Sequence, residues 1–115
     1  MIKLQFKVLG KDWTLRALKK KKFKEKHGNH VAVTHPIKRY IDLTPKGINK
    51  HTITHELVHA HLTEMGIDAT DISVEDLEEV FCELMAKHGE DLLKTAEDLF
   101  IRLRVEKADL PGDIE

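Results

Sequence analysis

The run His55-Glu56-Leu57-Val58-His59 constrains this chain more than any other stretch, because it fixes both a secondary structure and a chemistry. Residues four apart lie one above the other on a helix, so the imidazoles of His55 and His59 can point at one ion. Two imidazole nitrogens at about 2.0–2.1 Å suit Zn²⁺, and Glu56 is placed to act on a zinc-bound water as general base. The H-E-x-x-H pattern therefore predicts a zinc site with His55 and His59 as ligands and Glu56 as the catalytic residue.

The residues around this motif are those of a helix with buried apolar sides. The apolar positions are Ile53, Leu57, Val58 and Leu62. Asn49 is a good N-cap, and Gly66 stands where a C-terminal glycine is expected. We therefore predict a helix over about 50–64, inside a zinc-helix region of 48–66. An ordinary amphipathic helix that carries two histidines by chance is the alternative, and glutamate in the second position favours the metal site.

A second long helical region is expected over residues 73–105. Ser73 is a candidate N-cap, and Glu75 and Asp76 follow in the first turn, where negative side chains favour the helix dipole. The positions at helical spacing are Leu77, Phe81, Leu84, His88, Leu92, Ala96, Leu99 and Leu103. Gly89 leaves open whether this region is one helix or a pair. Residues 109–115, which include Pro111-Gly112, are expected to form a flexible tail.

The N-terminal part predicts a small sheet. Residues 2–9 and 13–18 alternate apolar and polar positions, and residues 30–34 and 37–43 are rich in strand-forming side chains. Short connections favour antiparallel pairing. Residues 19–29 are too charged to form a core element, so we expect a loop or a short frayed helix there.

Together these segments predict an α+β fold. A mostly antiparallel sheet of three or four strands in residues 1–44 would pack on the zinc helix and on the long C-terminal helix or helix pair. At 115 residues the chain is long enough for one modest core, so residues 1–108 are expected to form a single domain.

Charge is divided unevenly along the chain. Residues 1–50 hold 14 Lys and Arg against 3 Asp and Glu, whereas residues 51–115 hold 5 against 17, which leaves a net charge of −1. The interpretation we favour is that the two halves neutralise each other in the fold. The lysine-rich run Lys19–Lys24 is the alternative, as a basic surface for nucleic acid or an acidic protein.

Composition also bears on the compartment. The single cysteine, Cys82, excludes an internal disulfide and a cysteine-based zinc ribbon, and it favours a reducing cytoplasm. No apolar run approaches the about 18 residues that a membrane helix needs, and the N-terminus lacks an apolar signal segment. We expect a cytoplasmic protein without a membrane partner.

A catalytic zinc needs a third protein ligand. The extended H-E-x-x-H-x-x-G-x-x-H pattern fails here, because Leu62 and Met65 occupy the glycine and third-histidine positions. A glutamate from the second helix is the other option. Spacing alone leaves four candidates open, and these are Glu75, Glu78, Glu79 and Glu83.

Two motifs of the chain resemble those of the ImmA/IrrE-type metallopeptidases, above all their small phage-encoded, minigluzincin-like members. The first is His-Glu-Leu-Val-His at 55–59, and the second is Glu-Val-Phe-Cys-Glu-Leu-Met-Ala at 79–86. The second family motif reads, loosely, Glu-x-x-Ala-Asn-x-Phe-Ala. Glu79 matches its glutamate, whereas Cys82 and Glu83 depart from the pattern. The resemblance covers roughly residues 37–90.

This resemblance implies a compact gluzincin with one Zn²⁺ per chain and Glu79 as the third ligand. It also implies a hydrolase that works in the cytoplasm, which is the host cytoplasm for a phage-encoded member. Other residues have weaker claims on the site. His51 precedes His55 by one turn, His61 follows the motif, and His88 or Tyr40 could stabilise an oxyanion. Each of these is more readily explained as a structural or surface residue.

The leading hypothesis is a zinc-dependent peptidase with a protein or peptide substrate. Glu56 would take a proton from the metal-activated water and pass it to the leaving amine. A substrate strand would add to the sheet edge, for which the strand containing Tyr40 is the natural candidate. So small a scaffold leaves little chain for a deep pocket, so we expect a narrow, partner-dependent or weak activity.

The alternative is a non-catalytic zinc-binding module that acts through its basic N-terminal half on nucleic acid or an acidic protein. A SprT-like, DNA-linked protease would combine the two ideas. Glu56 discriminates between a peptidase and a non-catalytic module, because a purely structural zinc needs no general base. Its presence favours the peptidase.

Overall fold

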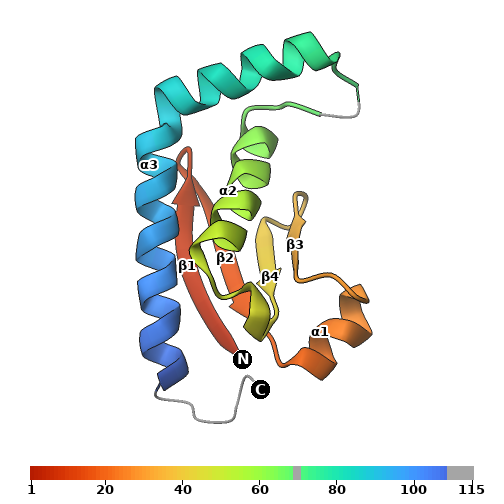
Figure 1. Ribbon diagram of the computed structural model, residues 1–115, viewed down its shortest axis with the longest axis vertical. Coiled ribbons are helices and arrows are strands. Elements are labelled where there is room, and N and C mark those ends of the chain that lie inside the picture. Colours follow the sequence, from red (N-terminus) through yellow and green to blue (C-terminus); the bar gives the residue numbers. More distant parts are fainter. Residues whose placement is uncertain (69–70, 109–115) are drawn as a thin grey trace.

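Four short strands from the N-terminal part form one mixed sheet in the computed structural model, which describes residues 1–68 and 71–108 (Figure 1). The strands are β1 (Ile2–Val8), β2 (Lys11–Ala17), β3 (Ala32–His35) and β4 (Tyr40–Leu43), in the order β1-β2-β4-β3. The β1–β2 and β3–β4 pairs are antiparallel, and β2 runs parallel to β4. The predicted α+β class with a mostly antiparallel sheet is confirmed.

The strand order places β3, and not β4, at the open edge next to the helix that carries the H-E-x-x-H motif. A parallel pair needs a crossover connection, and here the chain leaves β2, forms helix α1 (Lys20–His27) and β3, and only then inserts β4 beside β2. The expectation that the strand containing Tyr40 forms the edge is therefore wrong. The sequence pattern marks both segments as strands but does not say which one reaches the interior.

Helix α1 corrects the expectation for the lysine-rich segment. Its lysines are exposed, but Phe23 is buried. His27 at its end lies 2.7 Å from the fully buried carboxylate of Asp42, which also accepts hydrogen bonds from Arg16 at 2.5 and 2.7 Å. The segment is thus a short helix, which is one of the two expected alternatives. It also contributes a buried residue, because Phe23 and the contact between His27 and Asp42 hold it to the sheet.

Two helices cover the face of the sheet opposite to the one that carries Asp42. Helix α2 (Lys50–Glu64) follows the 3-10 turn at Pro45–Gly47, and Thr52 N donates to the Asn49 side chain at 2.8 Å, which confirms the predicted N-cap. Helix α3 (Val74–Ala108) is continuous through Gly89, and Figure 1 shows that it bends: its first part runs above the end of α2, and its second part runs down beside β1.

The core lies between the helices and this face of the sheet. Its largest fully buried members are Ile2, Trp13, Leu15, Ile41, Leu43, Ile53, Leu57, Leu84, Leu92 and Leu99. Along β1 every second residue is buried, so the alternation seen in the sequence corresponds to one covered face.

Two further predictions concern membrane-spanning helices and the C-terminal tail. No helix within residues 1–68 and 71–108 is long and apolar enough to cross a membrane. The flexible tail predicted for residues 109–115 lies outside the described residues.

Candidate metal centre

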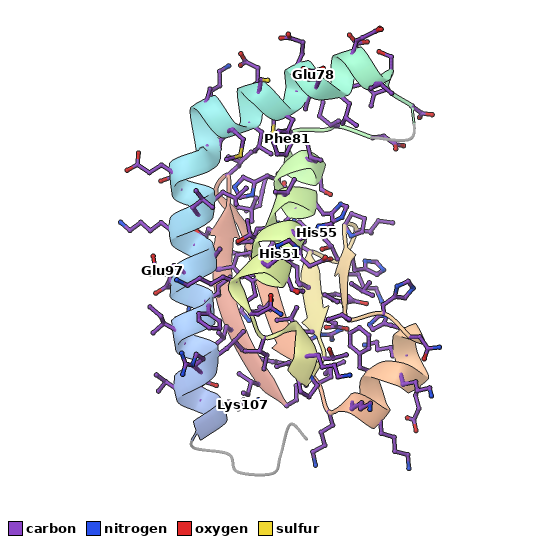
Figure 2. All side chains as sticks on the ribbon, in the orientation of Figure 1. His51, His55, Glu78, Phe81, Glu97 and Lys107 are labelled. Carbon is purple, nitrogen blue, oxygen red and sulfur yellow. The ribbon has the colours of Figure 1, made fainter. Side chains whose placement is uncertain are left out.

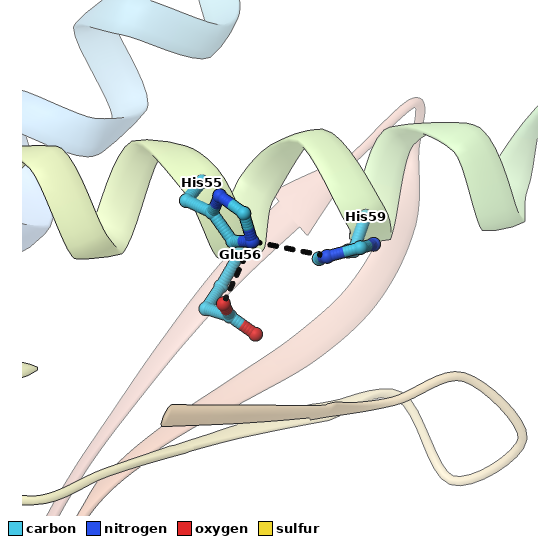
Figure 3. A group of neighbouring side chains, drawn as sticks. All are labelled: His55, Glu56 and His59. Atoms are coloured by element: carbon cyan, nitrogen blue, oxygen red, sulfur yellow. Dashed lines mark hydrogen bonds and ion pairs between the residues drawn. The ribbon is translucent and has the colours of Figure 1, made fainter. Parts of the chain in front are cut away.

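The two histidines of the motif converge on one point above α2 (Figure 3). Their Nε2 atoms lie 3.3 Å apart, and the ring centroids are 5.0 Å apart. Two nitrogens bound at about 2.05 Å to a tetrahedral ion would be separated by about 3.3 Å, so this spacing is the one that a shared zinc requires. The i, i+4 relation on a regular helix produces it without help from other elements.

Glu56 completes a compact group beneath the histidines. Its side chain is 9% exposed, whereas that of His55 is 62% exposed, and Glu56 Oε2 lies 3.8 Å from His55 Nε2. One ligand atom from each of His55, Glu56 and His59 falls within 4.8 Å of the others. Of all the described His, Cys, Asp and Glu residues, these are the three that such a grouping brings together.

The hydroxyl of Thr34 holds the Glu56 carboxylate from the sheet side. Thr34 Oγ1 donates to Glu56 Oε1 at 2.8 Å across the space between β3 and α2. This hydrogen bond fixes the orientation of the Glu56 carboxylate. Sequence reasoning missed Thr34, since nothing in the residues around it shows which strand will face the helix.

Two grooves flank the histidines. One runs between α2 and β3, and it is lined by Thr34, Glu56, His55 and His59 among others. The other runs between α2 and α3, is mostly apolar, and includes His51, Phe81 and Leu93. His55 and His59 line both grooves, so they form the ridge between them, open to solvent from either side.

The backbone of β3 is open along the first groove. Thr44 N donates to Val31 O at 3.0 Å, and β3 continues this pairing with β4 as Val33 opposite Asp42 and His35 opposite Tyr40. Bonded pairs alternate along an antiparallel ladder, so the N–H and C=O groups of Ala32 and Thr34 point away from β4, toward the free edge. An extended peptide could pair with these groups beside Glu56.

The structure does not bring Glu79 to the histidines. Glu79 is exposed and lies outside the group of three, as do the other candidates Glu75, Glu78 and Glu83. Figure 2 shows the reason: Glu78 sits on the first part of α3, which passes above the end of α2 and away from His55. Glu79 as third ligand stays a prediction from the family resemblance.

The other residues considered for the site, except His51, lie away from His55 and His59 and contact other parts of the fold. His61 is buried, its Nδ1 lies 2.8 Å from Leu57 O, and burial lowers its pKa; His88 lies beside it on the side of α2 away from the metal centre. The ring of Tyr40 stacks on His35 and lies 4.0 Å from the Arg16 guanidinium, on the sheet face opposite α2. His51 alone of these residues lines one of the two grooves beside His55 and His59.

No protein-family model matches the chain, and no curated protein and no solved structure is significantly similar to it. The likeness to ImmA/IrrE-type metallopeptidases thus rests on the residues of the two motifs, 55–59 and 79–86.

Proposed function

We propose that the protein is a zinc-dependent metallopeptidase. The observation that carries this proposal is the group of His55, Glu56 and His59, whose nitrogen spacing of 3.3 Å suits a shared zinc and whose buried carboxylate lies directly beside it. Histidines that were merely solvated on a helix surface would not need a buried glutamate held in place by a threonine.

The donor set fits Zn²⁺. Imidazole nitrogens with an adjacent carboxylate are typical of catalytic zinc centres, in which His55 and His59 would be the first two ligands. Bound zinc would supply a water of lowered pKa and polarise the carbonyl of the substrate. The third ligand is Glu79 by the family resemblance, and this assignment requires the first part of α3 to approach α2 more closely.

Glu56 has the position of a general base. Oε1 is occupied by the Thr34 hydroxyl, so Oε2, which lies nearer His55, is the atom that takes a proton from the attacking water. The same atom can return the proton to the leaving amine. Burial of the side chain keeps bulk water from competing for this carboxylate.

The edge of β3 would orient the substrate. A peptide that pairs with Ala32 and Thr34 would lie in the groove between β3 and α2, with one of its peptide bonds beside Glu56 and the two histidines. Backbone pairing of this kind selects an extended chain rather than a folded surface.

Hydrolysis of a fluorogenic peptide library by zinc-loaded protein tests the proposal. Glu56→Gln should reduce the rate by about 100-fold or more while the zinc content stays that of the wild type, because the substitution removes the base but no histidine ligand. Glu90→Gln, on the exposed side of α3, is the matched control and should leave the rate unchanged. Equal rates for wild type and Glu56→Gln would contradict the proposal.

A further inference from the structure

A pocket lined by lysines lies at the N-terminal end of β3. It has a volume of about 410 Å³ between α1, the segment that leads into β3, and the turn that precedes α2. Its lining residues are Lys20, Phe23, Lys24, Gly28, Asn29, His30, Val31, Thr44, Pro45, Lys46 and Lys107, and no aspartate or glutamate is among them. Among the residues that the structure describes, the charged side chains that line this pocket are therefore all lysines.

Three of these lysines are available to a ligand. Lys20, Lys24 and Lys46 are exposed, and within residues 1–68 and 71–108 their ammonium groups form no ion pair. Two separate elements supply them, since Lys20 and Lys24 lie one turn apart on α1 and Lys46 lies in the turn before α2. Like charges gathered from different elements around one hollow favour an anionic occupant.

The lysine pocket continues the groove of the metal centre. His30 lines both hollows, and the chain from His30 to Thr34 leads directly from one to the other. Four residues of extended chain span about 13 Å. A peptide paired with β3 beside Glu56 would consequently reach the lysines with residues about three to five positions from the bond that is cleaved.

We infer that the substrate is a peptide segment with acidic residues about three to five positions to one side of the cleaved bond, and that Lys20, Lys24 and Lys46 bind them. This inference rests on the proposed peptidase function, because it takes the groove beside Glu56 to be the substrate cleft. It gives the positive charge of the N-terminal half a role in substrate choice.

Two features favour an acidic peptide over nucleic acid. Among the described lining residues, Phe23 is the one Phe, Tyr or Trp, and it is 1% exposed, so the smaller His30 ring is the exposed ring left for a base to stack on. The pocket also opens into a strand edge with free backbone N–H and C=O groups at Ala32 and Thr34, which pair with a polypeptide.

Fluorescence anisotropy with labelled peptides tests the inference on the full chain, both as EDTA-treated wild type and as zinc-loaded Glu56→Gln protein. Each peptide has an uncharged central segment and three glutamates or three glutamines, placed at either its N-terminal or its C-terminal side. We expect one glutamate peptide to bind about tenfold more tightly than its glutamine counterpart, which is what three exposed ion pairs contribute. About 0.5 M NaCl should remove most of this difference through screening.

Variants of matched charge locate the effect. Lys24→Gln/Lys46→Gln should abolish the preference for glutamate, whereas Lys21→Gln/Lys22→Gln, which removes two charges from α1 outside the pocket, should retain it. An equal loss in both double variants would overturn the inference, since it would mean that only general positive charge matters.

Other results would also overturn it. Equal binding of the glutamate and glutamine peptides in both placements would show that the pocket does not bind acidic residues selectively. A single-stranded oligonucleotide also serves as a competitor of the labelled glutamate peptide. If it displaces that peptide at a lower concentration, per unit of charge, than unlabelled glutamate peptide does, nucleic acid is the occupant. Zinc content is measured on the same samples, so a failure of the metal site is seen separately from a failure of peptide selection.

Discussion

Thr34 lies 22 residues before Glu56 in the chain, yet its hydroxyl is the contact that orients the proposed base. Thr34 is a positioning residue, because its side chain acts through Glu56. Thr34→Val removes the donor at nearly constant volume and should lower the rate of peptide hydrolysis by about tenfold, which corresponds to the loss of one hydrogen bond to a charged group. The zinc content should not change, since both histidines remain.

Thr34→Ser separates orientation from packing. Serine retains the hydroxyl and should recover most of the rate that valine loses, although it removes a methyl group from the groove. If the valine and serine variants hydrolyse peptide equally fast, the hydrogen bond between Thr34 and Glu56 has no part in the reaction.

On the scale of the elements, α1 is held to the sheet by the fully buried carboxylate of Asp42. This carboxylate binds Arg16 through two hydrogen bonds and His27 through a third. Asp42→Asn leaves the guanidinium of Arg16 without its counter-ion in a largely covered position, so we expect a loss of about 3–5 kcal/mol in the free energy of unfolding. Urea denaturation at neutral pH measures this loss.

The matched control for Asp42 is Asp12, which pairs with Lys7 across the β1–β2 hairpin at 2.6 Å but is exposed, as is its partner. Water solvates both of these charges, so Asp12→Asn should shift the urea midpoint little. A similar midpoint shift in the two variants would contradict the assignment of Asp42 as the anchor of α1.

A second polar contact ties the end of α2 to the sheet. Glu64 accepts hydrogen bonds from Arg39 at 2.6 Å and from Trp13 at 3.1 Å, and the Arg39 guanidinium lowers the pKa of Glu64. This pair joins the basic N-terminal half to the acidic C-terminal half, whereas Asp42 and its partners Arg16 and His27 all belong to the N-terminal half. Arg39–Glu64 and Lys50–Glu97 each join one charge from either half, which is the kind of contact that the uneven charge suggests.

How far the sequence predicts the structure depends on how local each feature is. His55, Glu56 and His59 follow from helix periodicity alone, and the capping by Asn49 follows from the residue and its place. The position of β3 at the edge does not follow, because it depends on the crossover through α1, which pairs residues far apart in the chain. Thr34 was missed for the same reason.

At the scale of the whole molecule, the position of α3 decides which residue can complete the proposed metal centre. Its second part packs along the core through Leu92 and Leu99, whereas its first part, which carries Glu79, extends past the end of α2. The second sequence motif and the structure thus differ on whether Glu79 is near the histidines. Substitution of Glu79, compared with Glu83 on the same helix face, addresses this difference.

The most direct test of the central claim is the zinc content of the purified protein by elemental analysis, for the wild type and for His59→Ala, Glu79→Gln and Glu83→Gln. We predict about one zinc per wild-type chain, loss of zinc in His59→Ala and Glu79→Gln, and retention in Glu83→Gln. Retention in Glu79→Gln would leave the histidine site in place and reject Glu79 as a ligand. A folded wild type that holds no zinc after incubation with excess metal would contradict the metallopeptidase account.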